Sequence, residues 1–171
     1  MKRYWATGPA MSASLLIAMT FALATGNAAF AQQTIGGGMG GFQETPAIST
    51  AGTGSFLANI LAGDTQINFQ LNYSGLSGPP SMAHIHLGQR GVAGGVVAFL
   101  CGGGTKPACP ASGLVTGTIT SADVQAVTAQ GIAAGELSEF LVAIRAGVTY
   151  ANVHTTLFGA GEIRGQIRPL N

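Results

Sequence analysis

Residues 66–73 read QINFQLNY, and this stretch decides the fold class. Its apolar residues alternate strictly with asparagine and glutamine, which is the period-two pattern of a strand with one buried and one solvated face. Glycine, proline and serine separate it from other short segments with strand character. These further predicted strands cover residues 50–60, 82–87, 94–101, 113–120, 149–155 and 162–168. Short strands with turns between them predict an antiparallel sandwich or barrel.

Helical spacing occurs only late in the chain. Apolar residues recur at helical spacing over residues 137–144, and Gly147 follows as a C-terminal stop. A second short helix is expected to begin at Asp123, behind a cap at Thr120 or Ser121. We therefore predict an all-β domain in which one or two short helices form a late crossover.

The composition is rich in glycine and poor in charge. The 171 residues contain seven Lys and Arg against six Asp and Glu, and charged residues make up only 8% of the chain. A nucleic-acid-binding protein would need a basic patch, so no nucleic-acid partner is expected. The 27 glycines follow no Gly-X-Y period, which excludes collagen and indicates many turns.

The N-terminal residues have the pattern of a secretory signal peptide. A basic pair at residues 2–3 precedes an apolar run at residues 14–24, and small residues precede a cleavage point after Ala31. This run is shorter than the roughly 20 residues of a membrane anchor. We expect export to the periplasm or cell exterior, with no membrane span after signal cleavage. The predicted organisation is a signal peptide at 1–31, a flexible Gly-rich lead-in at 32–41 and one domain at 42–171.

The two cysteines fit an oxidising compartment. Cys101 and Cys109 enclose the seven residues GGGTKPA, which are flexible enough to bring the two residues within bridging distance. We expect a disulfide. The alternative is a two-thiolate metal site, although no histidine lies nearby in sequence to complete it.

All three histidines lie in predicted strands near sharp turns. His84 and His86 are two residues apart, so both imidazoles project from one face of their strand. A hairpin of the last two strands could bring His154 beside Glu162. If the strand of His84 neighbours this hairpin, three imidazoles and one carboxylate converge in a set typical of zinc or copper ligands. Glu162 would be the fourth ligand or would orient one.

A structural hydrogen-bond network is the other interpretation of these residues. An imidazole held between a carboxylate and a backbone carbonyl is satisfied without a metal. Asn152 shares a strand face with His154, and Arg164 shares one with Glu162, so both could complete such a network.

Three motifs, in order, resemble the CHRD domain, the module first named from chordin. They are Glu44-Thr45-Pro46, AHIHLGQRGVAGGVVAFL at residues 83–100, and the YANVHT and GEIRGQI runs within residues 150–167. The resemblance implies a bacterial exported protein and an immunoglobulin-like or Greek-key β-sandwich, but no settled biochemical activity. The residues that match its motif positions are His84, His86, Gly88, Gly91, Asn152, His154, Glu162, Arg164 and Gly165.

A weaker similarity is to copper/zinc superoxide dismutase, another exported β-sandwich with a His-x-His strand. Separate copper and zinc sites need more than the three histidines of this chain, so dismutase chemistry is excluded while one mononuclear site stays open. The chain also has no Gly-x-Ser-x-Gly elbow and no phosphate-binding glycine motif.

We therefore predict an exported, non-catalytic binding or structural module whose partner is an extracytoplasmic protein or a polysaccharide. The alternative is a mononuclear copper or zinc protein. A metal site requires the ring nitrogens to converge on one point. A binding module requires an exposed apolar patch, for which Phe42, Tyr73 and Phe158 are the candidates.

Overall fold

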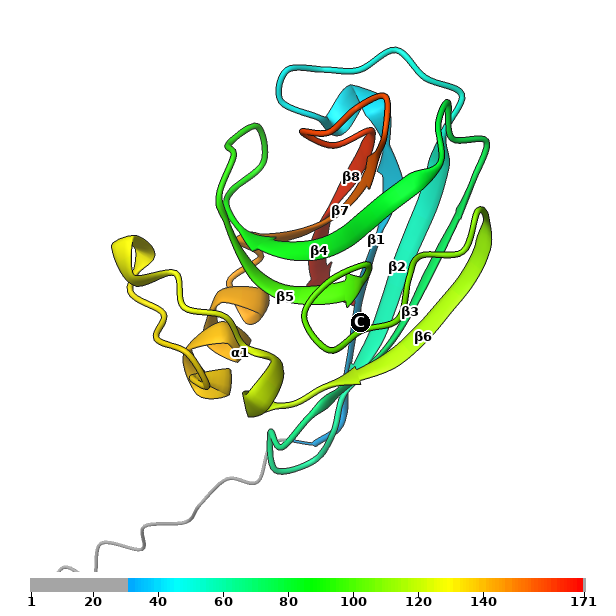
Figure 1. The fold of residues 1–171 in the computed structure, drawn as a ribbon. Helices are drawn as coiled ribbons and strands as arrows, with labels where there is room; N and C mark the ends of the chain where they lie inside the picture. Colours follow the sequence, from blue (N-terminus) through cyan, green and yellow to red (C-terminus); the bar gives the residue numbers. More distant parts are fainter. Residues whose placement is uncertain (1–30, 171) are drawn as a thin grey trace, which may run out of the picture.

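The computed structural model describes residues 31–170, so the predicted signal peptide lies outside the described residues except for Ala31. Eight antiparallel strands form one sheet in the order β5-β4-β7-β8-β1-β2-β3-β6, which curls until it is nearly closed as a barrel (Figure 1). The strands are β1 (Gln33–Gly40), β2 (Thr53–Ile60), β3 (Ile67–Ser74), β4 (Pro80–Leu87), β5 (Gly95–Cys101), β6 (Gly113–Ile119), β7 (Thr149–Thr155) and β8 (Ile163–Pro169). The helices are the 3-10 turns η1 (Gly41–Gln43), η2 (Ser121–Asp123) and η3 (Thr128–Gln130), and the α-helix α1 (Leu137–Arg145).

The all-β antiparallel prediction is confirmed, whereas the immunoglobulin-like or Greek-key sandwich is not. The reason is strand β1, which lies where the sequence predicts a flexible lead-in at 32–41. β1 pairs with β2 along its whole length and with β8 on its other side, so it joins two four-stranded halves into one continuous sheet. The lead-in prediction is wrong because four of the eight residues of β1 are glycine, which hides the alternation of its buried Ile35 and Met39.

The glycines of β1 are required because the backbones approach closely. A Cβ on Gly37 would overlap the backbone carbonyl oxygen of Gln166 in β8. A Cβ on Gly165 of β8 would in turn overlap the carbonyl oxygen of Gly38. Only glycine allows two backbones to pack this tightly.

The core fills the inside of the barrel. The predicted alternation holds over residues 67–73, whose apolar side chains are all buried while the polar ones between them are exposed. Tyr73 is therefore not part of an exposed patch; its hydroxyl donates a hydrogen bond to the Pro110 carbonyl at 2.6 Å. Helix α1 buries the predicted apolar face, and Gly147 follows it with a φ of 69°.

Two local predictions have different outcomes. The helix expected from Asp123 is only the single 3-10 turn η2, which the Asp123 carboxylate caps through the backbone N–H of Thr120 at 2.9 Å. Cys101 and Cys109 form the predicted disulfide, so the two-thiolate metal site is wrong. Within residues 31–170 no helix is both long and apolar enough to cross a membrane.

The close approach of β1 and β8 makes a stability prediction. Gly37→Ala forces the two backbones apart and should lower the free energy of unfolding by about 1–3 kcal/mol, as overpacking does. Gly38→Ala is the matched control, because a Cβ there meets nothing within 4 Å and should change stability by less than about 0.5 kcal/mol. Urea unfolding of both variants measures the difference. Equal stability of the two variants would contradict the proposed need for glycine.

Candidate metal centre

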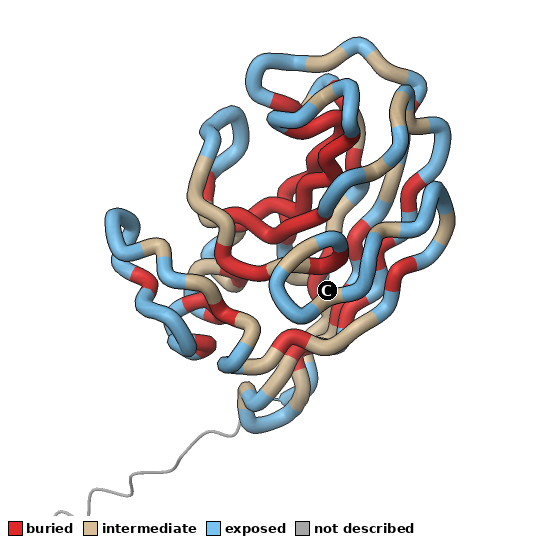
Figure 2. The backbone as a smooth tube through the Cα atoms, viewed as in Figure 1, coloured by how far each residue is buried: buried red, intermediate tan, exposed pale blue. Residues whose placement is uncertain are grey.

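Strand β7 is buried at all seven positions, on both of its faces. Figure 2 shows this buried backbone continuing from β7 into the neighbouring strands β4 and β8. The inner face is apolar core, whereas the outer face of these three strands carries polar side chains. They are His84, His86, Tyr150, Asn152, His154, Arg164 and Gln166, which we call the polar face.

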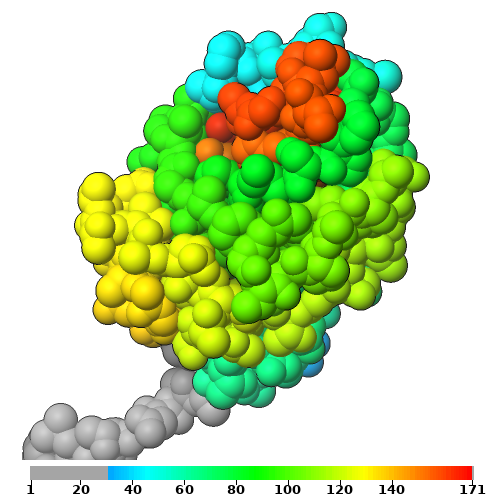
Figure 3. Space-filling model, viewed as in Figure 1, coloured from blue at the N-terminus to red at the C-terminus, as the bar shows by residue number. Residues whose placement is uncertain are grey.

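Loops from three parts of the chain cover the polar face. They comprise residues 41–52, 88–94 and 156–161, which lie around the same strands in Figure 1. In the space-filling view, a block of orange atoms near the C-terminal end of the chain stands at the surface between the cyan and green parts, and a few orange and red atoms are visible deeper beside it (Figure 3). The polar side chains are buried although they point away from the core.

The three histidines meet on this face. β4 lies beside β7, which is the arrangement that the predicted convergence requires. One ring nitrogen from each of His84, His86 and His154 lies within 4.8 Å of those from the other two. The three residues are 5%, 7% and 7% exposed, respectively. The spacing of histidines in the sequence thus leads to a real cluster.

The hydrogen bonds of the cluster assign the tautomers. His86 Nδ1 lies 3.0 Å from the Gly94 carbonyl oxygen, and His154 Nδ1 lies 3.1 Å from that of Gly159. Since a carbonyl oxygen can only accept, both Nδ1 atoms carry hydrogen and both Nε2 atoms carry lone pairs. His84 Nδ1 then donates to His154 Nε2 at 3.1 Å.

This assignment leaves two lone pairs without a donor. His84 Nε2 and His86 Nε2 are buried and have no hydrogen-bond partner. A buried acceptor without a donor costs about 1–3 kcal/mol. A cation that binds to both nitrogens would remove this cost and so stabilise the folded protein.

Burial also keeps the imidazoles neutral. Loss of hydration, with repulsion from the neighbouring histidines, lowers the pKa of His84 to about 3. Burial is likewise the main cause that lowers the pKa of His86 to about 4, and it lowers the pKa of His154. Neutral imidazole is the form that binds a metal, so no proton has to leave these groups near pH 7.

Glu162 is not part of the histidine cluster. Its Oε1 accepts hydrogen bonds from Thr50 Oγ1 at 2.6 Å and from the Ser77 backbone N–H at 2.7 Å, and its Oε2 accepts one from Thr155 Oγ1 at 2.8 Å. Burial raises the pKa of Glu162, but these hydrogen bonds outweigh burial and lower it. The Glu162 carboxylate therefore links three separate segments by hydrogen bonds. It does not have the ligand position that the sequence predicts.

Arg164 belongs to a stack that ends on the cluster. Its guanidinium carbon lies 3.6 Å from the centroid of the Tyr150 ring, and the Tyr150 ring is parallel to that of His86 at 4.8 Å. Arg164 also donates to the carbonyl oxygens of Val92 and Gln89 at 3.2 and 3.3 Å. The stack places a buried positive charge close to one of the three imidazoles.

Glu44 is a site residue for which the sequence assigns no role. It is 8% exposed, and burial raises its pKa to about 7 although the charge of Arg164 opposes this. Its Oε1 and the Oδ1 of Asn152 have no hydrogen-bond partner, and both lie 2.7 Å from where a Cβ on Gly161 would stand. Burial disfavours the charged carboxylate, which is why the protonated form of Glu44 persists to a higher pH than usual.

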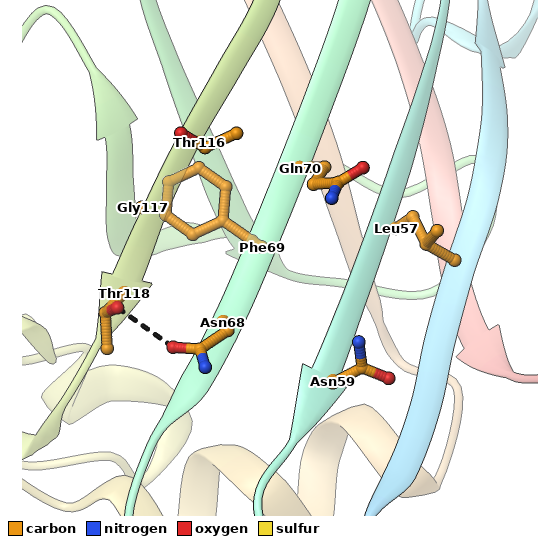
Figure 4. A pocket seen from close by; sticks show the side chains of 8 residues that line it. All are labelled: Leu57, Asn59, Asn68, Phe69, Gln70, Thr116, Gly117 and Thr118. Atoms are coloured by element: carbon orange, nitrogen blue, oxygen red, sulfur yellow. Dashed lines mark hydrogen bonds between the residues drawn. The ribbon is translucent and has the colours of Figure 1, made fainter.

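A second hollow lies on the outer face of β2, β3 and β6, with a volume of about 440 Å³ (Figure 4). Its lining contains no charged residue: Leu57, Asn59, Asn68, Phe69, Gln70, Thr116, Gly117 and Thr118. Among the predicted patch residues, Phe42 is 82% exposed and Phe158 is half-buried.

The fold and site together define an all-β module, whose single antiparallel sheet is nearly closed as a barrel, with a buried histidine cluster on its outer face. The CHRD domain family matches residues 38–167, and the chain belongs to this family. No curated protein and no solved structure matches the chain. Membership of the CHRD family suggests a β module without a catalytic role.

The pKa of Glu44 predicts a pH-dependent stability. Between pH 4.5 and 7 the folded state holds a proton that the unfolded state releases, so stability falls as the pH rises through this window. Glu44→Gln removes the effect. Relative to this variant, the wild type should lose roughly 2 to 3 kcal/mol between pH 5 and pH 8.5 in urea unfolding.

The control is Glu139→Gln, which removes an exposed carboxylate from α1 and should follow the wild type. A constant difference between wild type and Glu44→Gln at both pH values would show that the Glu44 carboxyl does not titrate as its burial requires.

Proposed function

We propose that this chain is an exported, non-catalytic CHRD module that binds a single copper or zinc ion through His84, His86 and His154. The observation that carries the proposal is the pair of buried imidazole nitrogens, on His84 and His86, that have no donor. A purely structural network would give each of the three Nε2 atoms a hydrogen-bond donor. In this cluster only the Nε2 of His154 has one.

The distances suit one ion. Nitrogens bound to the same zinc at 2.0–2.1 Å stand about 3.3 Å apart in a tetrahedral site. The ring nitrogens of the cluster already lie within 4.8 Å of one another. To complete the site, the His84 imidazole would have to turn so that its Nδ1–H no longer donates to His154 Nε2, which frees the third lone pair for the ion.

The hydrogen bonds behind the imidazoles also suit a metal. A ligating histidine commonly donates its other ring N–H to a carbonyl or carboxylate, which fixes the tautomer and the ring orientation. Gly94 and Gly159 supply such carbonyl oxygens to His86 and His154. Both acceptors are backbone groups in loops that cover the polar face.

Export is supported by two features. The first 31 residues have the pattern of a signal peptide. The Cys101–Cys109 disulfide is the kind of bond that persists in oxidising compartments. Both features favour the periplasm or the cell exterior, where the partner would be a protein or a polysaccharide.

Elemental analysis tests the metal site. The protein, purified from the exported fraction without a His-tag or chelator, should contain about one equivalent of copper or zinc or take one up from solution. His86→Ala and His154→Ala should each reduce this to near zero, because each removes one of three ligands.

Glu162→Gln separates the two possible ligand sets. Because the Glu162 carboxylate is bonded to Thr50, Ser77 and Thr155, this variant should keep the metal stoichiometry of the wild type. A protein that neither contains nor binds metal, or that keeps its metal without His86 or His154, would refute the proposed function.

The uncharged hollow favours a second candidate function, the binding of a neutral polysaccharide. Amide and hydroxyl groups from three adjacent strands line it, and they can hydrogen-bond to sugar hydroxyls without attracting charged ligands. Gln70 and Thr116 face each other across β3 and β6 at its centre. This function is independent of the histidines and would coexist with a metal site.

Retention on an insoluble neutral glucan tests this second function. Gln70→Ala combined with Thr116→Ala should reduce the retained fraction several-fold, whereas Ser138→Ala on the exposed side of α1 should not. Equal retention of the two variants, or no retention of the wild type, would remove the glucan as a ligand of this hollow.

A further inference from the structure

We infer that the histidine cluster selects the monovalent cuprous ion over divalent zinc or cupric ions, and that the positive charge of Arg164 sets this selectivity. This inference rests on the proposed metal-binding function. It follows from the charges around the cluster, from its burial and from the one thioether on its face.

The donor set carries no negative charge. All three ligands are imidazoles, and no carboxylate of residues 31–170 joins their cluster. The nearest acid along the chain from His154 is Glu162, whose oxygens are bound to other partners. A bound metal therefore keeps its full formal charge in a site whose residues are only 5–7% exposed.

Burial penalises a dication more than a monocation. The cost of removing an ion from water grows with the square of its charge, so a divalent ion costs about four times as much as a monovalent ion of the same size. Anionic ligands offset that cost in many zinc and cupric sites, whereas none of the three ligands of this cluster is an anion.

Arg164 adds repulsion that scales with the metal charge. Its guanidinium carbon lies 3.6 Å from the centroid of the Tyr150 ring, and that centroid lies 4.8 Å from the centroid of the His86 ring. Neither the Lys106–Asp123 ion pair nor the Arg145–Asp64 ion pair involves it. The acid that senses the charge of Arg164 is Glu44, whose pKa burial raises to about 7. Repulsion between Arg164 and a bound ion is twice as large for a dication as for a monocation.

Met82 provides a donor that suits cuprous copper. It alternates with the core residue Ala83, so it lies on the same face of β4 as His84 and His86. It is also the cross-strand partner of His154. A thioether is a soft ligand that favours cuprous copper and contributes little to zinc. At 36% exposure Met82 is only partly covered by its neighbours.

Competition titrations of the exported protein test the inference. Cuprous ion is titrated under reducing, oxygen-free conditions against bicinchoninate, and zinc is titrated against a chromophoric chelator. Wild type should bind cuprous ion at least about tenfold more tightly than zinc, and Arg164→Gln should lower this ratio roughly tenfold. Arg164→Lys keeps the charge and should keep the ratio.

Met82→Leu should weaken cuprous binding roughly tenfold and leave zinc binding unchanged. Its matched control is Met39→Leu, which changes the other methionine of the described residues, on the inner face of β1. These two variants and the wild-type ratio decide the question even where Arg164→Gln fails to fold.

The outcomes separate the two proposals. Absence of binding for every metal refutes the proposed function and the selectivity with it. Metal binding in which zinc equals or exceeds cuprous ion, or in which a folded Arg164→Gln variant keeps the wild-type ratio, overturns the selectivity alone. A cuprous preference that Met82→Leu leaves intact would also overturn it, because the soft donor is part of its cause.

Discussion

The backbone contact between β1 and β8 is the constraint on which the rest of the structure depends. It joins the two four-stranded halves into one sheet, and it requires glycine on both strands. Without β1, one edge of β8 would be unpaired and the core inside the barrel would be open along its length. With β1 in place, β8 and β7 are central strands, and their outer face can support a buried polar site.

The polar face contains buried hydrogen-bond acceptors that have no donor in the folded protein. Five buried side-chain atoms in residues 31–170 have no hydrogen-bond partner, and four of them belong to Glu44, His84, His86 and Asn152. All four atoms are hydrogen-bond acceptors when Glu44 is ionised. The polar face therefore contains more buried acceptors than donors. Such an arrangement is costly unless a proton or a metal ion completes it. A proton on Glu44 removes the charge of its buried carboxylate, and a metal ion would bind the unpaired nitrogens of the histidines.

Sequence patterns predict those features of the structure that are determined by residues close together in the sequence. The alternation at 67–73, the helix at 137–144, the disulfide and the shared face of His84 and His86 all follow from local spacing. Strand β1 is not predicted because glycine has no side chain to show the alternation. The hydrogen bonds of Glu162 are not predicted because Thr50, which binds its carboxylate, is 112 residues away in the sequence. Likewise, the stack of Arg164, Tyr150 and His86 depends on strand order, which no local pattern contains.

In the proposed metal site, the loop at residues 88–94 would link the rate of metal exchange to the motion of one segment. Its carbonyl groups bind His86 and Arg164, its Gly94 N–H binds the Tyr150 hydroxyl, and its first carbonyl accepts from Gln166. An ion that enters or leaves beneath this loop must therefore wait for several hydrogen bonds to break together. Opening would release a ligand and the nearby charge in the same event. Exchange would then be slow and nearly independent of metal concentration, so the module would hold its ion kinetically as well as thermodynamically.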